Sequence, residues 1–367
     1  MIKLTQPYIP EEAIVEVVKV LRSGNLVQGE YVKNFEEQVF KYLNIKHAIA
    51  VSSGTAALHL SLIALNIKPG DEVIVPAFTY PATANVVEII GAKPVFVDIG
   101  LDDLCIKPSL IEKAITPKTK AIIPVHEFGQ SAKMDDIISL AEKYGLKIIE
   151  DAACALGTEF NNQKVGTIGD IGCFSLHPRK AITTGEGGFV ATNNDSIADK
   201  IRSLRNHGIK VRDNGMYDFI YAGFNYRMTD FQAALGIQQL QLLDKIISKR
   251  IQLADYYNEN LSEISWIRIP RKITARRMVY QTYHALVSDF VNRDMLITYL
   301  KTNNIEANIG AYALCSLTYY KQKYGLSDSI FPNAQFAFEK GLALPMSYSL
   351  ESDTINYIVE ILKKFKV

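Results

Sequence analysis

The sequence predicts an α/β fold in which a mostly parallel sheet is flanked by helices, with a smaller α+β domain at the C-terminus. Short apolar strands alternate with helices over much of the first half of the chain, and this alternation is typical of a parallel sheet covered on both faces. The chain has 367 residues, 48% of them hydrophobic. This length exceeds the size at which one core keeps growing, so we expect a large domain over residues 1–245 and a small domain over residues 246–367.

Composition excludes several classes of partner. Forty basic and 39 acidic side chains give a formal net charge of +1, which argues against binding to nucleic acid or to an anionic membrane. The four cysteines show no CxxC spacing, so we expect neither a zinc or other metal site nor a disulfide framework, and a reducing, cytoplasmic setting fits them. Charged residues interrupt the first 24 positions, and no apolar stretch approaches the ~20 residues of a membrane span, so we expect neither a signal peptide nor a transmembrane helix.

The first elements in chain order are two amphipathic helices, predicted over residues 10–22 and 32–43 from the spacing of their apolar side chains. A short apolar strand over residues 48–51 then runs into Ser52, Ser53, Gly54 and Thr55, and a helix rich in Ala and Leu follows over residues 56–65. The N-terminus of a helix leaves backbone N–H groups unpaired at the positive end of its dipole. The turn is therefore a candidate phosphate site, with a plain Ser/Thr N-cap as the alternative.

Further strands and helices alternate after this turn, and the strands end in polar or aromatic side chains. Tyr80, His126 and Asp151 lie at or near the ends of three predicted strands. Ligands of open α/β sheets bind beyond the carboxyl ends of the strands, so we expect Ser53 to Thr55, Tyr80, His126 and Asp151 to converge on one crevice. The strands are expected over residues 72–76, 94–98, 120–125 and 146–150, and the helices over residues 84–90 and 134–144.

Residues 171–189 hold the lysine that the sequence singles out. Lys180 follows a segment that is predicted to be a buried strand. Arg179 is adjacent to it in the sequence, and a glycine-rich bend comes after it. A lysine becomes a nucleophile when its ammonium is desolvated or set beside positive charge, although a lysine taken at random is a solvated surface residue. The glycines at 166, 169 and 172 precede a strand rather than a helix, so they are not a dinucleotide fingerprint.

The rest of the chain is predicted more coarsely. Residues 201–225 show little apolar periodicity and are expected to form a long irregular excursion, of the kind that often serves as a binding loop or lid. A strong helix follows over residues 229–247 and is expected to lead out of the large domain. The C-terminal domain is expected to contain a strand at 282–287 and helices at 293–302 and 353–365.

The ordered set of phosphate turn, aromatic side chain, strand-end carboxylate and glycine-flanked lysine points to pyridoxal phosphate. The cofactor's phosphate suits the turn, its ring nitrogen requires a buried carboxylate such as Asp151, and its aldehyde requires an amine such as Lys180. Tyr80 supplies an aromatic neighbour for the ring. Each residue alone has an ordinary alternative: a helix N-cap for Asp151, a core position for Tyr80, and a hydrogen-bonded structural role for His126.

Five sequence blocks in order resemble the DegT/StrS type of sugar aminotransferase, within the fold type I class of pyridoxal phosphate enzymes. The resemblance covers nearly the whole chain. The blocks are VSSGTAALHL, GDEVIVPAFTYPATAN, IIEDAACALG, GDIGCFSLHPRKAITTGEGG and GFNYRMTDFQAALG.

The resemblance implies a role for each matching residue. Lys180 would form the Schiff base and move protons, Asp151 would hold the pyridinium nitrogen, and Tyr80 would stack on the ring. Gly54, Thr55 and Ser175 would bind the phosphate. Asn225 would reach that phosphate from the partner subunit of a homodimer with shared active sites. His177 and Arg227 are candidate substrate contacts, and a structural cap is an equal alternative for Arg227. The chain departs from its relatives at Cys154, where they commonly carry a polar side chain.

The resemblance also implies the reaction. The expected activity is transfer of the amino group of L-glutamate to a nucleotide-linked keto sugar, and the form of the lysine block is similar to members that aminate a 4-keto-6-deoxy hexose. Two alternatives stay open. One is a pyridoxal phosphate sugar dehydratase of the same fold, whose relatives replace the lysine with histidine. The other is a regulator that binds the cofactor without turnover.

Overall fold

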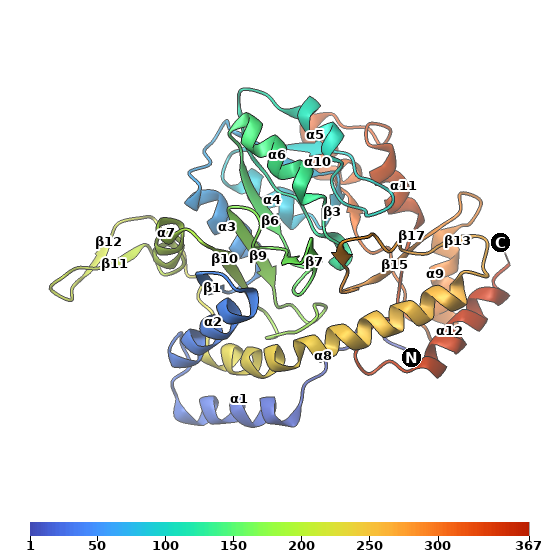
Figure 1. Ribbon diagram of the computed structural model, residues 1–367, viewed down its shortest axis with the longest axis horizontal. Coiled ribbons are helices and arrows are strands. Elements are labelled where there is room, and N and C mark those ends of the chain that lie inside the picture. Colours follow the sequence, from blue (N-terminus) through green and yellow to red (C-terminus); the bar gives the residue numbers. More distant parts are fainter. Residues whose placement is uncertain (367) are drawn as a thin grey trace.

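The computed structural model describes residues 1–366 and has a central seven-stranded sheet in the order β1-β10-β9-β6-β5-β2-β4 (Figure 1). Strands β9, β6, β5, β2 and β4 pair in parallel, whereas β10 runs antiparallel to both β1 and β9. The predicted mostly parallel sheet is thus confirmed. Its strands are β1 (His47–Val51), β2 (Glu72–Pro76), β4 (Lys93–Val97), β5 (Thr119–Ile122), β6 (Lys147–Asp151), β9 (Ile171–Ser175) and β10 (Gly188–Thr192).

Helices cover both faces of this sheet because its strands are apolar on both sides. On β2, Val73 and Val75 join the core beneath α3, α4 and α7, whereas Ile74 joins the core beneath α2, α6 and α8. Successive strand side chains point to opposite faces, so one apolar strand supplies both cores. The covering helices other than α8 are α2 (Glu30–Leu43), α3 (Gly54–Ala64), α4 (Ala82–Ile89), α5 (Pro108–Ala114), α6 (Met134–Tyr144) and α7 (Asp195–Arg205).

One long helix, α8 (Asp230–Leu261), links the N-terminal and C-terminal parts of the molecule. Its first half lies along α1 (Glu11–Ser23) and α2, and its second half lies against α12 (Ser352–Lys364), as Figure 1 shows. Thr229 and Gln232 form a capping box at its start. The helix was predicted to end at 247, and it continues through the proposed domain boundary at 245. The division into two domains stays a prediction.

The C-terminal region is a second, smaller α+β layer with its own core. Strands β13, β15 and β17 form an antiparallel sheet that packs with the end of α8, α9 and α12. The segment between α9 and β17 returns to the large layer, where β16 and β3 (Phe78–Thr79) form a separate two-stranded antiparallel sheet. The elements are β13 (Ile267–Arg268), β15 (Tyr283–Val287), α9 (Arg293–Thr302), β16 (Tyr312–Ala313), α10 (Thr318–Tyr324), α11 (Pro332–Lys340) and β17 (Gly341–Leu344).

The predicted irregular excursion over residues 201–225 is wrong. The chain instead completes helix α7 and then forms a hairpin of β11 (Ile209–Val211) and β12 (Tyr217–Phe219), which Figure 1 shows projecting from the body. The apolar residues of α7 begin before this window, and each hairpin strand has only three residues, so neither element is long enough within the window to predict a helix or a strand. The remaining short elements are η1 (Glu127–Gly129), η2 (Leu314–Ser316), β7 (Glu159–Phe160), β8 (Gln163–Lys164) and β14 (Arg276–Arg277).

Candidate active site

Residues that follow neighbouring strands meet at one edge of the central sheet. Val51, the last residue of β1, pairs with Gly188, and Gly188 pairs with Ser175 at the end of β9. Asp151, the last residue of β6, pairs with Cys173 on the same β9. The start of α3 and the ends of β6 and β9 therefore lie at the carboxyl edge, where open α/β sheets bind their ligands.

The turn between β1 and α3 presents backbone donors at this edge. Ser53 is the N-cap of α3, and its Oγ accepts from the Ala56 N–H at 3.0 Å. The N–H groups of Gly54 and Thr55 lie in the first turn, where a helix offers them no acceptor. A Cβ on Gly54 would lie 2.9 Å from the Cβ of Ser175, so the absence of a side chain lets the turn approach the end of β9. Gly54, Thr55 and Ser175 are thus brought together at the positive end of α3.

Asp151 supplies a buried carboxylate beside this turn, with 5% of the residue exposed. Its Oδ2 accepts from Thr83 Oγ1 at 2.8 Å, and its Oδ1 accepts from the Ala153 N–H at 3.2 Å. Burial raises the pKa of Asp151, and the two hydrogen bonds and the nearby charge of Lys180 oppose that rise. The residue closes a strand, so the N-cap alternative does not apply. A buried anion of this kind favours a cation next to it.

Lys180 lies in the loop between β9 and β10, half-buried, and its Nζ donates to Cys154 Sγ at 3.0 Å. Burial favours the neutral amine, but Cys154 and the carboxylates of Asp151 and Glu127 outweigh burial, so the pKa of Lys180 is raised. We had expected desolvation and Arg179 to favour the neutral amine. That expectation is wrong for the protein alone, because Arg179 is exposed and acidic groups face the lysine.

Glu127 is a member of this group that sequence reasoning missed. It follows β5, only 5% of it is exposed, and burial raises the pKa of its carboxyl to about 7. The charge of Lys180 opposes that rise, and the charge of Asp151 adds to it. An acidic residue directly after a predicted strand and a histidine was a signal that could have identified it.

His126 is placed beside these residues, but its ring is fully used within the chain. Its Nε2 lies 2.9 Å from Glu150 Oε2, and its Nδ1 accepts from the Ala132 N–H at 3.0 Å. The structural alternative for His126 therefore holds. The remaining partners of the Glu150 carboxylate are the N–H groups of Gly166, Ile168 and Gly169, each at 2.7 Å.

The four remaining predicted site residues lie toward the surface. Tyr80 is 67% exposed, which excludes the core alternative, and Asn225 is also exposed. His177 is half-buried, and its Nδ1 accepts from the Arg179 N–H at 3.2 Å. Arg227 donates to Asn206 Oδ1 at 2.5 Å, at the end of α7. Arg227 is thus committed to a structural contact.

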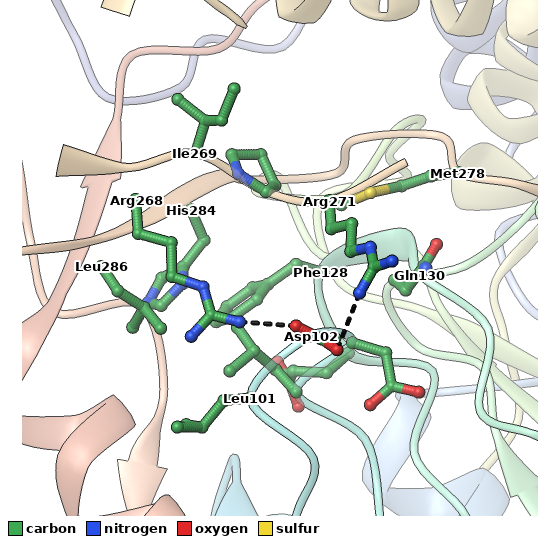
Figure 2. Close-up of a pocket in the computed structure, with 14 residues that line it drawn as sticks. Leu101, Asp102, Phe128, Gln130, Arg268, Ile269, Arg271, Met278, His284 and Leu286 are labelled. Atoms are coloured by element: carbon green, nitrogen blue, oxygen red, sulfur yellow. Dashed lines mark hydrogen bonds and ion pairs between the residues drawn. The ribbon is translucent and has the colours of Figure 1, made fainter. Parts of the chain in front are cut away.

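A narrow crevice opens next to this group, between the loop after β4 and the C-terminal layer. Figure 2 shows Asp102 between the guanidinium groups of Arg268 and Arg271, at 2.5 and 3.1 Å. Glu127 and Phe128 also line the crevice. It therefore connects the buried carboxyl of Glu127 with a charged rim.

The residues present fit a ligand with a phosphate, a ring cation and a carbonyl carbon. Donors at the start of α3 suit the phosphate, the buried charge of Asp151 suits the cation, and the amine of Lys180 suits the carbonyl. Among residues 1–366, no cluster of three His, Cys, Asp or Glu side chains could hold a metal ion. Within the same residues, no helix is long and apolar enough to cross a membrane.

Comparison with known proteins identifies relatives over nearly the full chain. A GDP-perosamine synthase of Vibrio cholerae is 37% identical, over 92% of this chain and 91% of its own. A UDP-4-amino-4-deoxy-L-arabinose–oxoglutarate aminotransferase of Shewanella sediminis is 36% identical, over 97% and 96%. Spr1654 of Streptococcus pneumoniae, described as a sugar aminotransferase, is 31% identical in its PMP form, with a TM-score of 0.95 over 99% and 98% of the two chains. The PLP form of Spr1654 gives a TM-score of 0.92.

The model of the DegT/DnrJ/EryC1/StrS aminotransferase family matches residues 7–363. The fold type I architecture expected from the sequence is confirmed by the structural likeness. The cofactor is pyridoxal phosphate, as in the PLP and PMP forms of the structural relative. The chain therefore belongs to the DegT/DnrJ/EryC1/StrS family and is a pyridoxal phosphate-dependent sugar aminotransferase.

Proposed function

We propose that this enzyme transfers the amino group of L-glutamate to C4 of a nucleotide-linked 4-keto-6-deoxy hexose. The names of two relatives support a nucleotide sugar, since one contains GDP-perosamine and the other a UDP-linked amino sugar. The second name also contains oxoglutarate, the keto acid that glutamate becomes when it loses its amino group. The observation that carries the proposal is the convergence of Asp151 and Lys180 at the carboxyl edge of the sheet, where each affects the pKa of the other.

In this proposal each residue of the edge has one task. When bound, pyridoxal phosphate supplies a carbonyl that takes up an amino group and a ring that withdraws electrons from the reacting carbon. Gly54, Thr55 and Ser175 hold the phosphate through N–H and hydroxyl groups at the start of α3. Asp151 holds a positive ring nitrogen with its buried carboxylate. The Nζ of Lys180 would take a proton from the carbon that gives up the amino group and return it to the carbon on the other side of the nitrogen, as base and then acid.

The raised pKa of Lys180 is compatible with this role. A base must lose its proton, and in the protein alone Cys154, Asp151 and Glu127 retain it. A cation next to Asp151 neutralises one of these charges, so the pKa of Lys180 falls when Asp151 acquires its partner. Burial, which already favours the neutral amine, then has less to overcome.

We propose a homodimer with shared active sites, because several predicted contacts face outward from the single chain. Tyr80 and Asn225 are exposed at the edge of the site. The hairpin β11–β12 carries exposed Val211, Tyr217 and Phe219 away from the body (Figure 1). Exposed apolar side chains gathered on one projection are typical of an interaction surface. Asn225 would then reach the phosphate bound by the partner subunit.

The substrate contacts of His177 and Arg227 are part of the same proposal. His177 is half-buried beside the lysine loop, and burial lowers its pKa, so a neutral ring is available to hydrogen-bond a sugar hydroxyl. Arg227 is bound to Asn206, and it would contact the donor or the sugar diphosphate only after leaving that partner. A cytoplasmic location accompanies the proposal, supported by the four free cysteines.

Two experiments test the proposal. Glutamate added to the purified enzyme should remove its visible absorption in one half-reaction, and a 4-keto hexose from a panel of nucleotide-linked keto sugars should restore it. Borohydride reduction followed by peptide mapping should place the pyridoxyl group on Lys180. Loss of the sugar hydroxyl without amination would favour the dehydratase, and cofactor binding without a glutamate half-reaction would favour the regulator. A pyridoxyl group on another residue would refute the assignment of Lys180.

A further inference from the structure

The loop that carries Lys180 is held by glutamine side chains at three points of its backbone. Gln281 Nε2 donates to the Arg179 carbonyl at 2.6 Å, directly before Lys180. The Thr183 N–H donates to Gln239 Oε1 at 3.3 Å, and Gln232 Nε2 donates to the Glu186 carbonyl at 2.7 Å. The three glutamines lie outside the central sheet. One contact precedes Lys180 in the sequence, and the other two follow it.

Two of the three glutamines belong to helix α8. Gln232 and Gln239 are seven residues apart, which places them on one face two turns from each other. Gln239 is 1% exposed, and its Nε2 donates to the Tyr8 carbonyl at 2.7 Å. Both ends of its amide are therefore engaged, and the helix fixes the loop after Lys180.

The third glutamine, Gln281, lies in the C-terminal region and is itself anchored. Thr282 Oγ1 donates to Gln281 Oε1 at 2.9 Å, which turns the amide nitrogen toward Arg179. Arg250 of α8, 3% exposed, donates to the carbonyls of Tyr280 and Gln281 at 3.1 and 2.7 Å. Gln281 is 8% exposed. A continuous set of hydrogen bonds thus runs from α8 through residues 280–281 to the residue before Lys180.

We propose that Gln281 is a positioning residue for Lys180, through which the C-terminal region sets the place of the reactive amine. The inference rests on the proposed role of Lys180. A base that moves a proton between the two carbons on either side of the reacting nitrogen must stay aligned with both, and a displacement of about 1 Å can lower a rate about 100-fold. Without Gln281, the part-buried Arg179 carbonyl also loses the donor that fixes it, so the loop would rearrange rather than stay in place.

The test replaces the amide with a side chain of similar size. Gln281→Leu should lower kcat about 10- to 100-fold while the KM for glutamate changes less than about twofold. In the cofactor-free protein, amide hydrogen exchange of residues 177–184 should become about tenfold faster, with the rest of the chain unchanged. Gln252→Leu, the same change at an exposed position of α8, should alter neither measurement.

A second variant guards against misfolding. Thr282→Val removes the hydroxyl that orients the Gln281 amide but keeps Gln281 itself. It should lower kcat about three- to tenfold and increase exchange in the same residues by a smaller factor than Gln281→Leu does. Wild-type kcat and exchange in both variants would overturn the inference, as would a loss in Gln281→Leu that spreads over the whole exchange map. The proposed role of Lys180 fails separately, if borohydride mapping finds no pyridoxyl group on Lys180 in the wild-type protein.

Discussion

The buried and exposed halves of the candidate site differ in how completely one chain builds them. In the buried half, Asp151 has partners for both carboxylate oxygens, and Lys180 donates to Cys154. In the exposed half, Tyr80 is 67% exposed and Asn225 is also exposed. One chain thus assembles the groups proposed for proton transfer and leaves the outer side chains exposed.

This difference separates chemistry from recognition. The buried half is fixed by strand order and register, which a parallel sheet determines strongly because both of its faces are covered. The exposed half depends on side chains that lie after a short strand and in loops, and such segments carry specificity in many enzymes. Changes in the buried half should therefore affect turnover itself, and changes in the exposed half should affect assembly and affinity.

The largest effect is expected from Lys180→Ala. The variant lacks the amine that moves the proton, so turnover should fall more than about 1,000-fold, while the fold and some noncovalent cofactor binding remain. Steady-state assays would measure turnover, and circular dichroism would measure whether the fold remains. Lys120→Ala, at an exposed lysine of β5, should keep full activity. Multiple turnover by Lys180→Ala without an added amine would contradict the assignment.

The next effect concerns the acidic cluster around that lysine. The pKa of Glu127 is raised by burial from 4.5 to about 7, so the folded protein binds a proton there that the unfolded chain has released. The stabilisation is present below pH 4.5 and is lost as the pH rises through about 7. Glu127→Gln should remove this loss, which is on the order of 3 kcal/mol.

Denaturant unfolding of the cofactor-free protein between pH 5 and pH 8 would measure this difference, with wild type and Glu127→Gln compared at each pH. The two curves should approach each other at the acidic end and separate at the alkaline end. Parallel curves would show that Glu127 carries no buried charge, and the buried half would then be less acidic than the structure indicates.

A smaller effect is expected from the hairpin. Phe219→Asp places a charge on the exposed apolar projection, so the dissociation constant of the proposed homodimer should rise about tenfold or more. Sedimentation over a range of concentrations measures it, and activity should fall only where the dimer dissociates. Phe290→Asp makes the same change at another exposed phenylalanine, 71% exposed, and should leave assembly unchanged. An unaltered dimer in Phe219→Asp would remove the hairpin from the interface.

Sequence patterns predicted those parts of the buried half that lie at the ends of strands. The central-sheet strands other than β10 (Gly188–Thr192) were placed from apolar runs, and Asp151 and Ser175 lie at the ends of two of these strands. The hairpin was missed because each of its strands alternates in polarity over only three residues, which is too short to predict a strand. The direction of the Lys180 pKa was missed for another reason: Arg179 is adjacent in sequence, whereas Glu127 and Asp151 become neighbours only in the fold.

Contacts between segments that are far apart in the sequence also cannot be predicted from sequence patterns. Thr83 precedes Asp151 by 68 residues, and Gln281 follows Arg179 by 102. Neither separation is periodic, and each contact depends on where a helix or a C-terminal segment finally packs. The residues that position catalytic groups were therefore less predictable than those groups themselves.

The smallest effect is expected at Thr83, where one hydrogen bond to Asp151 is tested for its contribution to cofactor binding. Thr83→Val removes the hydroxyl that donates to Asp151 Oδ2 at 2.8 Å. This bond favours the ionised carboxylate, so its loss should raise the pKa of Asp151 further and weaken cofactor binding three- to tenfold, about 1 kcal/mol. Titration of the cofactor-free protein measures the affinity, and Thr298→Val, at an exposed threonine of α9, is the control. The gap between Thr83→Val and wild type should narrow as the pH rises, because Asp151 then ionises in both. A gap that is equal at every pH would mean that Thr83 acts through packing and not through the charge of Asp151.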